Sequence, residues 1–242
     1  MRVLLLAGLL ALAGHTVRAA EPAIVAAEGA AAAGDYRAAV RHYEQALQSR
    51  GFSAPLLFNL GNAYLRLGQP ARAILQYERA LLLAPDSAVI ESNLATARQR
   101  AGIAAPALSS WQAAARHFSF DTYLWVGLVA LWVLCAALVL VCLGRAARRC
   151  ARPLIVAAAV MLCVSADAAA LCWSDQYRAV VQEPTATRLA PAAAAAANGA
   201  VRAGELVWIQ DQYRGFDFVR AADGHSGWLP AGSVTVIRAA HP

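Results

Sequence analysis

The chain contains no lysine, and it contains no cysteine outside the region of its two long apolar runs. All 21 basic residues are arginines, and the five cysteines fall between residues 135 and 172. No pair of cysteines has the spacing of a CxxC motif with a histidine nearby. These absences exclude a disulfide framework, a thiol redox centre and a cysteine zinc site.

The motifs of known active sites are also missing. The five histidines are scattered, and there is no HExxH, GxSxG or P-loop sequence. No acidic pair stands in a recognisable catalytic context. The sequence therefore predicts a protein that is not an enzyme and that has no catalytic residues, metal ligands or cofactors.

Charged residues make up only 15% of the chain, against 60% hydrophobic residues. The formal net charge of +6 comes mainly from the extreme N-terminus and from a short segment with Arg145, Arg148, Arg149 and Arg152. A charge so dispersed makes no stripe that could follow a phosphate backbone, which excludes nucleic acid as a partner. The composition is too apolar for one ordinary soluble domain and indicates a membrane-tethered chain of several modules.

The N-terminus has the pattern of a secretory signal. Arg2 precedes a short apolar stretch, and the small residues Ala19 and Ala20 follow it. The stretch is too short to span a bilayer comfortably. We therefore expect residues 1–20 to be a signal peptide, with an uncleaved anchor as the alternative, and both export the segment that follows.

Two long apolar runs predict a pair of antiparallel transmembrane helices. Residues 123–143 contain no charge, and at ~1.5 Å of rise per residue they span the ~30 Å hydrocarbon layer. Residues 153–173 form the second run, interrupted only by Ser165 and Asp167. Residues 102–122, before the first run, are expected to be a linker along the membrane interface.

The arginine-rich segment between the runs, residues 144–152, predicts their orientation. Short arginine-rich loops stay in the cytoplasm, and the signal peptide independently exports the N-terminal segment. Both criteria place the loop inside and both flanking segments outside. The predicted location is the inner (cytoplasmic) membrane, with N- and C-terminal domains that are periplasmic or extracytoplasmic.

Asp167 is the one ionisable residue inside a predicted span. Such a residue is a functional hypothesis by default, most simply a polar contact with the transmembrane helix of a partner. The alternative is that the nearby membrane surface hydrates the carboxylate.

Residues 21–101 contain an internal repeat. Gly34 and Tyr43 recur 34 positions later as Gly68 and Tyr77. This period is typical of the tetratricopeptide (TPR) repeat, a pair of helices that stacks on its neighbours. The region holds about 2.5 repeats.

The central repeat has the helix signals of a TPR unit. The segment "APLLFNLGNAYLRLGQPARAILQYERALLLAPDS" predicts helices at about 55–67 and 70–83, separated by a Gly-Gln-Pro turn. Gly61 and Ala73 are small enough to let these two helices approach closely. Residues 87–101 form half a repeat, which predicts a capping helix.

One face of the repeat helices carries polar side chains. Asn59, Asn62 and Arg66 are spaced by three and four residues, and Asn93 and Arg100 repeat two of those positions. Asparagine amides can form paired hydrogen bonds with a peptide backbone, and arginines can bind a carboxylate. The pattern predicts a protein-binding groove for a peptide, with an ordinary solvated face as the alternative.

Residues 177–238 predict a small β-barrel. Short β-rich runs are divided by Gly and Asp turns, and "ADG" at 222–224 is a hairpin signal. The length suits five strands, with residues 192–199 as a loop insertion or short helix. The expected core consists of alternating apolar residues: Val207, Ile209, Phe216, Phe218, Trp228, Val234 and Val236.

The barrel segments "TATRLAP" and "AADGHSGWLPAGSVTVI" resemble a bacterial SH3-like domain (SH3b). Eukaryotic SH3 domains place an aromatic residue where this chain has "AGS", so polyproline binding is not expected. Four aromatic residues could line an SH3-like ligand surface, with core filling as the alternative for at least two of them: Trp208, Tyr213, Phe216 and Trp228. The predicted fold class is a multi-domain membrane protein with an all-α TPR solenoid, two transmembrane helices and a small all-β SH3-like barrel.

The order of these modules resembles the BatE-like TPR proteins of the Bat (Bacteroides aerotolerance) family. The sharpest local match is "FNLGNAYLRLGQPARAILQYERALLLAPD" followed by "NLATAR". The resemblance implies a non-enzymatic inner-membrane scaffold, encoded with MoxR-type ATPases and von Willebrand factor A-domain membrane proteins. It also implies a role in assembling an envelope complex linked to stress or oxygen tolerance.

Two other functions stay open from the residues alone. The SH3-like domain could bind peptidoglycan, which would make the chain a cell-wall-binding anchor or sensor. The chain could also be an accessory of an envelope enzyme such as a cytochrome maturation machine, although it has no haem or thiol motif.

Overall fold

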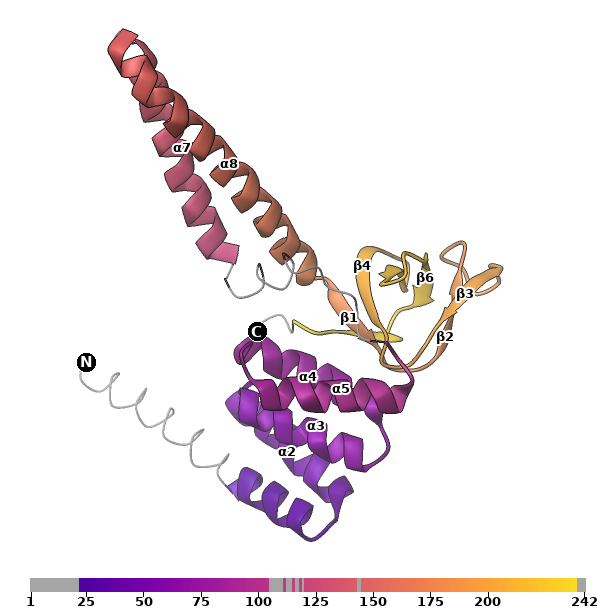
Figure 1. The fold of residues 1–242 in the computed structure, drawn as a ribbon. Helices are drawn as coiled ribbons and strands as arrows, with labels where there is room; N and C mark the ends of the chain where they lie inside the picture. The colour runs from indigo at the N-terminus through magenta and orange to yellow at the C-terminus, as the bar shows by residue number, and fades with distance from the viewer. Residues whose placement is uncertain are drawn as a thin grey trace, which may run out of the picture. The chain divides into compact units, whose positions relative to one another are not determined.

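The computed structural model divides the chain into two compact units, residues 1–106 with 178–242 and residues 107–177. The predicted signal peptide lies outside the described residues. Backbone is described for residues 22–104, 111, 115, 118, 120–142 and 145–238, and side chains for all of these except 145–150 (Figure 1).

Stacked helices make up the N-terminal part of the first unit (Figure 1). The helix bounds are Pro22–Ala32, α2 (Tyr36–Arg50), α3 (Ala54–Arg66), α4 (Pro70–Leu83) and α5 (Ala88–Ala101). The first helix of the predicted central repeat thus begins and ends about one residue earlier than expected, and the second has the expected bounds.

Local sequence chemistry sets the ends of these helices. The Asp35 carboxylate accepts a hydrogen bond from the Ala38 amide at 2.9 Å and caps the start of α2. Pro70 stands at the first position of α4, where its missing amide proton costs no helical hydrogen bond. Gly68, with φ 72°, supplies the left-handed turn between α3 and α4.

The contact between α3 and α4 is closest at Gly61. A Cβ atom on Gly61 would lie 2.6 Å from Cε1 of Tyr77, which is too close for two carbon atoms. Tyr77 and Ala73 are fully buried in this contact. The prediction that Gly61 and Ala73 permit a close approach of the two helices is confirmed.

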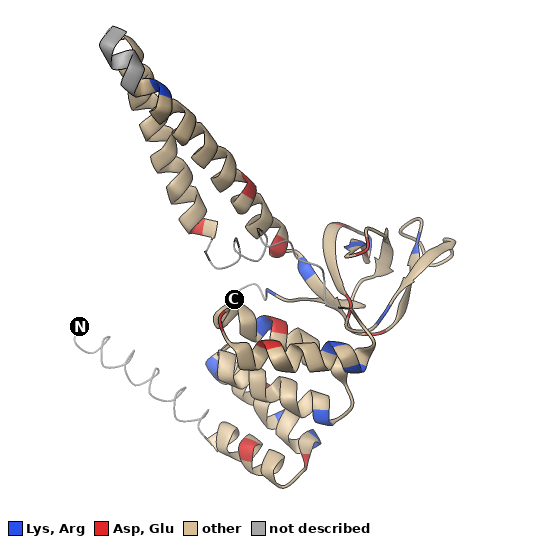
Figure 2. Ribbon diagram, in the orientation of Figure 1, with Lys and Arg blue, Asp and Glu red and all other residues tan. Residues whose placement is uncertain are grey.

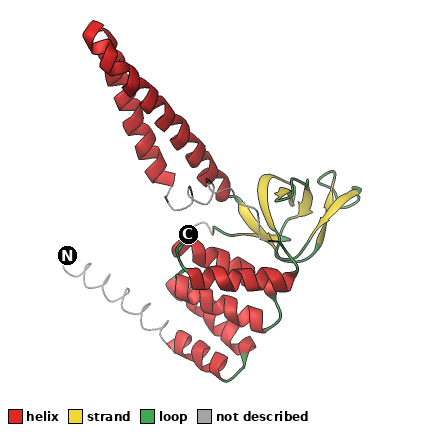
Figure 3. Ribbon diagram, viewed as in Figure 1, coloured by secondary structure: helices red, strands yellow, loops and turns green. Residues whose placement is uncertain are grey.

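The C-terminal part of the first unit is a curled antiparallel sheet (Figure 3). Its seven strands are ordered β3-β2-β6-β5-β4-β1-β7. The strand bounds are β1 (Arg178–Val181), β2 (Thr185–Arg188), β3 (Ala197–Val201), β4 (Leu206–Tyr213), β5 (Phe216–Ala221), β6 (Ser226–Pro230) and β7 (Val234–Val236).

The sheet has seven strands instead of the five predicted, and one of the two additional strands lies partly in the segment expected as a loop at 192–199. Residues 197–201 form β3, which pairs with β2. The Asn198 amide donates to the Ser226 carbonyl at 3.0 Å. A Cβ atom on Gly199 would lie 2.3 Å from Nε2 of His225. These contacts with β6 and the turn before it override the weak strand propensity of an Ala-Asn-Gly segment.

Two tight turns connect the central strands. The "ADG" turn at 222–224 joins β5 to β6, so that predicted hairpin is confirmed. The Asp223 carboxylate accepts from the His225 amide at 2.8 Å within this turn. Arg214 and Gly215, with φ 45° and 81°, join β4 to β5 in the left-handed conformation that tight hairpins favour.

The core of the sheet is built from smaller residues than predicted. Val207 and Val234 are buried as expected, and Ile209 packs against them. The other four predicted core residues are only half-buried and lie outside the buried cluster: Phe216, Phe218, Trp228 and Val236. Successive side chains of a strand point to opposite faces, so Val219 and Leu229 take the core positions instead.

The sheet docks on α4 through apolar residues and a buried ion pair. Val180, Leu206 and Ile237 join the buried cluster of the helices. Arg178 NH2 donates to Glu78 Oε2 at 2.9 Å, and both side chains are less than a tenth exposed. Arg98 donates to the other oxygen of Glu78. One carboxylate therefore links α4, α5 and β1.

Arg79 makes a second link between α4 and the sheet. Its NH2 group donates to the Val236 carbonyl at 2.9 Å, and its Nε donates to the Ile237 carbonyl at 3.1 Å. The guanidinium carbon also lies 5.5 Å from the ring centroid of Phe52. Desolvation by burial lowers the pKa of Arg79. The side chain thus covers the outer edge of β7, the last strand of the sheet order.

The second unit contains a pair of apolar helices, α7 (Phe120–Cys142) and α8 (Arg145–Asp175) (Figure 2). By length and composition, both are long and apolar enough to cross a membrane. Helix α8 begins at Arg145, so most of the segment predicted as a loop at 144–152 is helical. Its alanines and arginines have high helix propensity, which explains the longer helix.

Small residues form the contact between α7 and α8. Ala130 and Ala137 of α7 are buried, as are Ala151, Ala158 and Ser165 of α8. In the most apolar 18-residue stretch of each helix, only 11% of the residues of α7 and 17% of those of α8 are buried. The two helices therefore pack through small side chains and direct their large apolar side chains outward.

We expect Gly61→Ala to destabilise the first unit, because the new methyl group would overlap the Tyr77 ring. Overpacking of this kind costs about 1–3 kcal/mol. Gly29→Ala is the matched control, since it lies in the helix 22–32 and has nothing within 4 Å of its Cβ position. It should stabilise the helix by about 0.5–1 kcal/mol. Urea unfolding of the full chain in detergent measures both, and equal effects would contradict the close contact.

We expect Glu78→Gln to destabilise docking of the sheet, because it removes the carboxylate that Arg178 and Arg98 share. Breaking a buried ion pair costs about 3–5 kcal/mol. Hydrogen exchange of the β1 amides should speed up along with the fall in unfolding free energy. Glu91→Gln, at an exposed position of α5, should change neither quantity; similar results for the two variants would refute the assigned role.

Candidate functional site

Polar residues gather between α3 and α5 around the hydroxyl of Tyr77. The hydroxyl donates to Asn62 Oδ1 at 2.7 Å, and Asn93 Nδ2 donates to the same oxygen at 2.9 Å. Two of the predicted groove residues, Asn62 and Asn93, are therefore in direct contact. We name the α3–α5 polar cluster by its five members: Asn62, Arg66, Tyr77, Asn93 and Arg100.

The two arginines of the cluster are exposed. Burial raises the pKa of Tyr77 to about 12, against the opposing effects of Asn93 and of the positive charges on Arg100 and Arg66. Arg100 NH1 also lies 3.4 Å from the Leu65 carbonyl oxygen, to which it donates. Both guanidinium charges therefore oppose the effect of burial on the pKa of the same hydroxyl.

Asn59, the fifth predicted groove residue, is half-buried on α3. Within the described residues, no hydrogen bond joins its side chain to the polar cluster. The cluster nevertheless offers two exposed guanidinium groups beside the amides of Asn62 and Asn93. Guanidinium groups bind carboxylates in pairs of hydrogen bonds, and side-chain amides pair with peptide groups.

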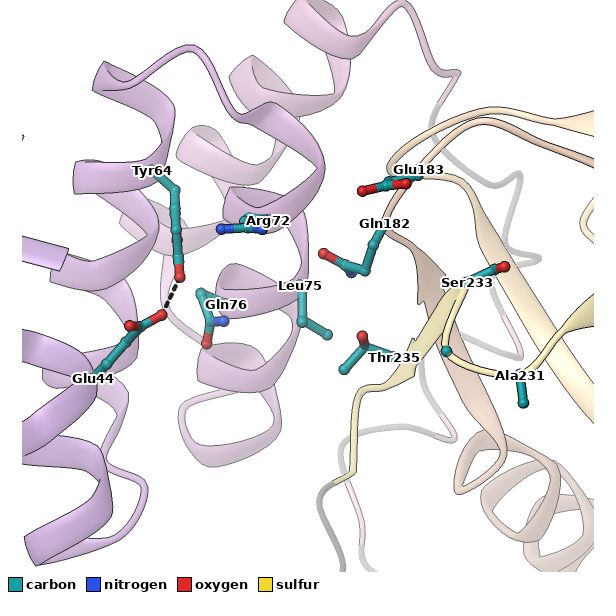
Figure 4. Close-up of a pocket in the computed structure, with 11 residues that line it drawn as sticks. Glu44, Tyr64, Arg72, Leu75, Gln76, Gln182, Glu183, Ala231, Ser233 and Thr235 are labelled. Atoms are coloured by element: carbon teal, nitrogen blue, oxygen red, sulfur yellow. Dashed lines mark hydrogen bonds between the residues drawn. The ribbon is translucent and has the colours of Figure 1, made fainter. Parts of the chain in front are cut away.

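A second polar site, which sequence reasoning missed, lies between the helices and the sheet (Figure 4). It is a pocket of about 640 Å³ within the first unit. Glu44, Tyr64, Arg72 and Gln76 line its helical side, and Gln182 and Glu183 line part of its sheet side.

Several of the side chains that line the pocket are held by neighbours. The Tyr64 hydroxyl donates to the Glu44 carboxylate, and the Arg72 guanidinium carbon lies 5.7 Å from the Tyr64 ring centroid. Burial, together with the hydrogen bond to Glu44, raises the pKa of Tyr64. Gln182 Nε2 donates to the Val180 carbonyl at 3.2 Å.

Gln76 is buried in the wall of this pocket with 7% of its surface exposed. Its Oε1 atom has no hydrogen-bond partner among the described residues. The one sequence signal for this site is Gln76, a polar residue that follows the apolar run 73–75 of α4. The sheet side of the pocket comes from the turn after the distant β1 and from residues 231–235, so the pattern of α4 alone could not locate the pocket.

The predicted aromatic surface is distributed over the sheet. Tyr213 is 48% exposed and is paired with Phe216 across β4 and β5. Trp228 is half-buried against Phe218, with ring centroids 5.1 Å apart. Trp208 is also half-buried and stands opposite Arg220 on β5. None of the four predicted aromatic residues belongs to the buried core cluster.

Asp167 has a hydrogen-bond partner within its own unit. The Trp111 indole Nε1 donates to Asp167 Oδ2 at 2.8 Å. The carboxylate that was expected to contact a partner helix thus accepts a hydrogen bond from this chain. In the part of the chain that the structure describes, no three His, Cys, Asp or Glu side chains are grouped as a metal site.

The raised pKa of Tyr77 predicts a loss of stability at high pH. Tyrosine in an unfolded chain ionises near pH 10, whereas folded Tyr77 keeps its proton to about pH 12. Its contribution is complete below pH 10 and is lost as the pH rises through 12. Between pH 10 and pH 12, the free energy of unfolding measured in urea should fall less for Tyr77→Phe than for the unchanged chain or for Tyr213→Phe. If Tyr77→Phe has the same pH dependence as the unchanged chain, the assignment is wrong.

Comparison with known proteins identifies the repeat at the centre of the first unit. Residues 54–87, which contain α3 and α4, match the family model of the tetratricopeptide repeat. No curated protein matches the chain. This chain thus contains the tetratricopeptide repeat that was predicted at these residues, a non-catalytic module of protein interaction.

Proposed function

We propose that this chain is a non-enzymatic membrane scaffold that binds a peptide segment of a partner protein at the α3–α5 polar cluster. One observation carries the proposal. Two exposed arginines stand beside two asparagine amides that a buried tyrosine hydroxyl holds in place. A site of this chemistry suits an acidic peptide segment, because it offers paired donors for a carboxylate and amides for the backbone.

The outward-facing apolar side chains of α7 and α8 support the membrane anchor. Trp125 and Trp132 are 67% and 71% exposed on α7. Apolar surface of this extent is unfavourable in water and favourable in lipid. The small residues between the helices are also typical of packing within a bilayer. By the positive-inside rule, the arginine-rich start of α8 lies in the cytoplasm and both modules of the first unit lie outside it.

The finer proposal is a scaffold in an envelope complex of the Bat and MoxR type. The order of helical repeats, apolar hairpin and C-terminal sheet agrees with the BatE-like resemblance. On this proposal, the partners are von Willebrand factor A-domain membrane proteins, and the complex serves stress or oxygen tolerance. The sheet is then the SH3-like domain, exported together with the repeats after cleavage of the signal peptide.

A photoreactive residue in place of Arg66 tests this proposal in membranes. We expect it to capture von Willebrand factor A-domain membrane proteins, because Arg66 belongs to the α3–α5 polar cluster. The same probe in place of Arg37, at an exposed position of α2, is the control and should capture none of them. Arg100→Glu should reduce capture at Arg66 roughly tenfold by charge repulsion. It also removes the hydrogen bond to the Leu65 carbonyl, so circular dichroism of the variant is needed to show that the helices are retained.

A wall-binding anchor is the second candidate, because four aromatic residues of the sheet lie outside its core. Sedimentation with purified peptidoglycan tests it. Pelleting that depends on Trp208, together with capture of only lipid and water at Arg66, would replace the scaffold proposal. Capture of membrane proteins at Arg66 without pelleting would remove the wall-binding alternative.

A further inference from the structure

The pocket between α4 and the sheet has walls that the docking of the sheet holds in place. Arg72, Leu75, Gln76 and Arg79 share one face of α4, at spacings of three and four residues. Arg79 binds the carbonyls at the edge of β7, and the other three line the pocket. The pocket is therefore part of the folded unit and not a gap between loosely joined domains.

Gln76 gives the pocket an unmet hydrogen-bond acceptor. The side chain is 7% exposed, and its Oε1 atom has no partner in the part of the chain that the structure describes. Buried polar atoms without a partner are destabilising, and native proteins retain few of them. The Oε1 atom is itself buried, and a half-turn of the terminal amide, which has a broad two-fold torsion, would exchange it with Nε2 and present it to a donor in the pocket.

The charged side chains that line the pocket favour a cationic ligand. Two carboxylates, Glu44 and Glu183, line it against one guanidinium, Arg72, which leaves one excess negative charge. Figure 4 shows Glu44 on the helical side and Glu183 on the sheet side, with Arg72 between them. This arrangement attracts a cationic group to either carboxylate and leaves Arg72 as a donor for a carbonyl oxygen.

The neutral lining residues are hydrogen-bonding groups that suit a peptide backbone. Gln182 and Thr235 face Gln76 and Leu75 across the pocket, and Ser233 also lines it (Figure 4). An extended backbone offers alternating N–H and C=O groups, which amide and hydroxyl side chains can match. The volume of about 640 Å³ lies within the ~300–1,000 Å³ of ligand pockets, which limits the occupant to a short segment.

We infer that this pocket binds a short extended peptide that carries lysine or arginine side chains. The basic side chains contact Glu183 and Glu44, a backbone carbonyl accepts from Arg72, and a backbone N–H donates to Gln76 Oε1. This site is separate from the α3–α5 polar cluster, whose two arginines favour the opposite charge. The chain would thus bind an acidic segment and a basic segment at different places on the same repeats.

The test measures binding of labelled peptides to the full-length chain in detergent by fluorescence anisotropy. The probe is acetyl-Ala-Lys-Ala-Lys-Ala-amide with a fluorescein label. Two matched peptides replace both lysines with glutamine or with glutamate. We expect the glutamine peptide to bind roughly tenfold more weakly than the lysine peptide, and the glutamate peptide to bind most weakly. Equal affinity for all three peptides would overturn the inference.

Two variants connect the binding to the pocket. Glu183→Gln, in an exposed turn, should weaken the lysine peptide severalfold and leave the glutamine peptide unchanged. Gln76→Leu removes the unmet acceptor, so it should weaken both peptides while the melting temperature stays equal or rises. Glu91→Gln, on the exposed face of α5, should bind as the unchanged chain does.

The outcomes separate this site from the proposed function. If neither Glu183→Gln nor Gln76→Leu changes the affinity for the lysine peptide, the peptide does not bind in this pocket. If Gln76→Leu fails to fold, Glu183→Gln alone decides, because it alters only an exposed turn. Photocapture at Arg66 should persist in Glu183→Gln. Absence of peptide binding in the pocket would therefore not contradict partner binding at the α3–α5 polar cluster.

Discussion

Glu78 is the residue on which the arrangement of the first unit depends. Its carboxylate accepts hydrogen bonds from Arg98 of α5 and Arg178 of β1, in surroundings that exclude water. A buried carboxylate is tolerated only when its charge is compensated, so α4 requires both arginines in place. The apolar contacts of Val180 and Leu206 with the helices supply the accompanying burial. Helical repeats and sheet consequently form one compact unit.

The docking of the sheet determines which polar surfaces stay accessible. It uses the face of α4 that carries Glu78 and Arg79, and this leaves the arginines of the α3–α5 polar cluster exposed. It also encloses Gln76 in a pocket that neither module could form alone. The helical repeats therefore border two chemically different sites, one beside two arginines and one whose lining has two carboxylates against one arginine.

Part of this arrangement could be predicted, because it follows from local rules. The repeat period makes Asn93 the equivalent of Asn59 in the next repeat, and stacking of the repeats brings their first helices together, as the hydrogen bond from Asn93 to Asn62 shows. The pocket could not be predicted, because its walls come from segments far apart in the chain. The position of Phe218 and Trp228 outside the core was missed for a related reason. Alternation gives a strand two faces, and hydrophobicity alone predicted that the face with the aromatic residues is the buried one.

The sequence by itself determined the helices of the repeats, the turn at Gly68, the hairpin at Asp223 and the two apolar helices. Each depends on residues within a few positions of one another or on a fixed period. Only the tertiary structure decided that residues 197–201 form a strand, that valines and Leu229 fill the core of the sheet, and that Glu78 joins it to the helices. Those outcomes depend on contacts between distant segments, whose partners exist only after the chain has folded.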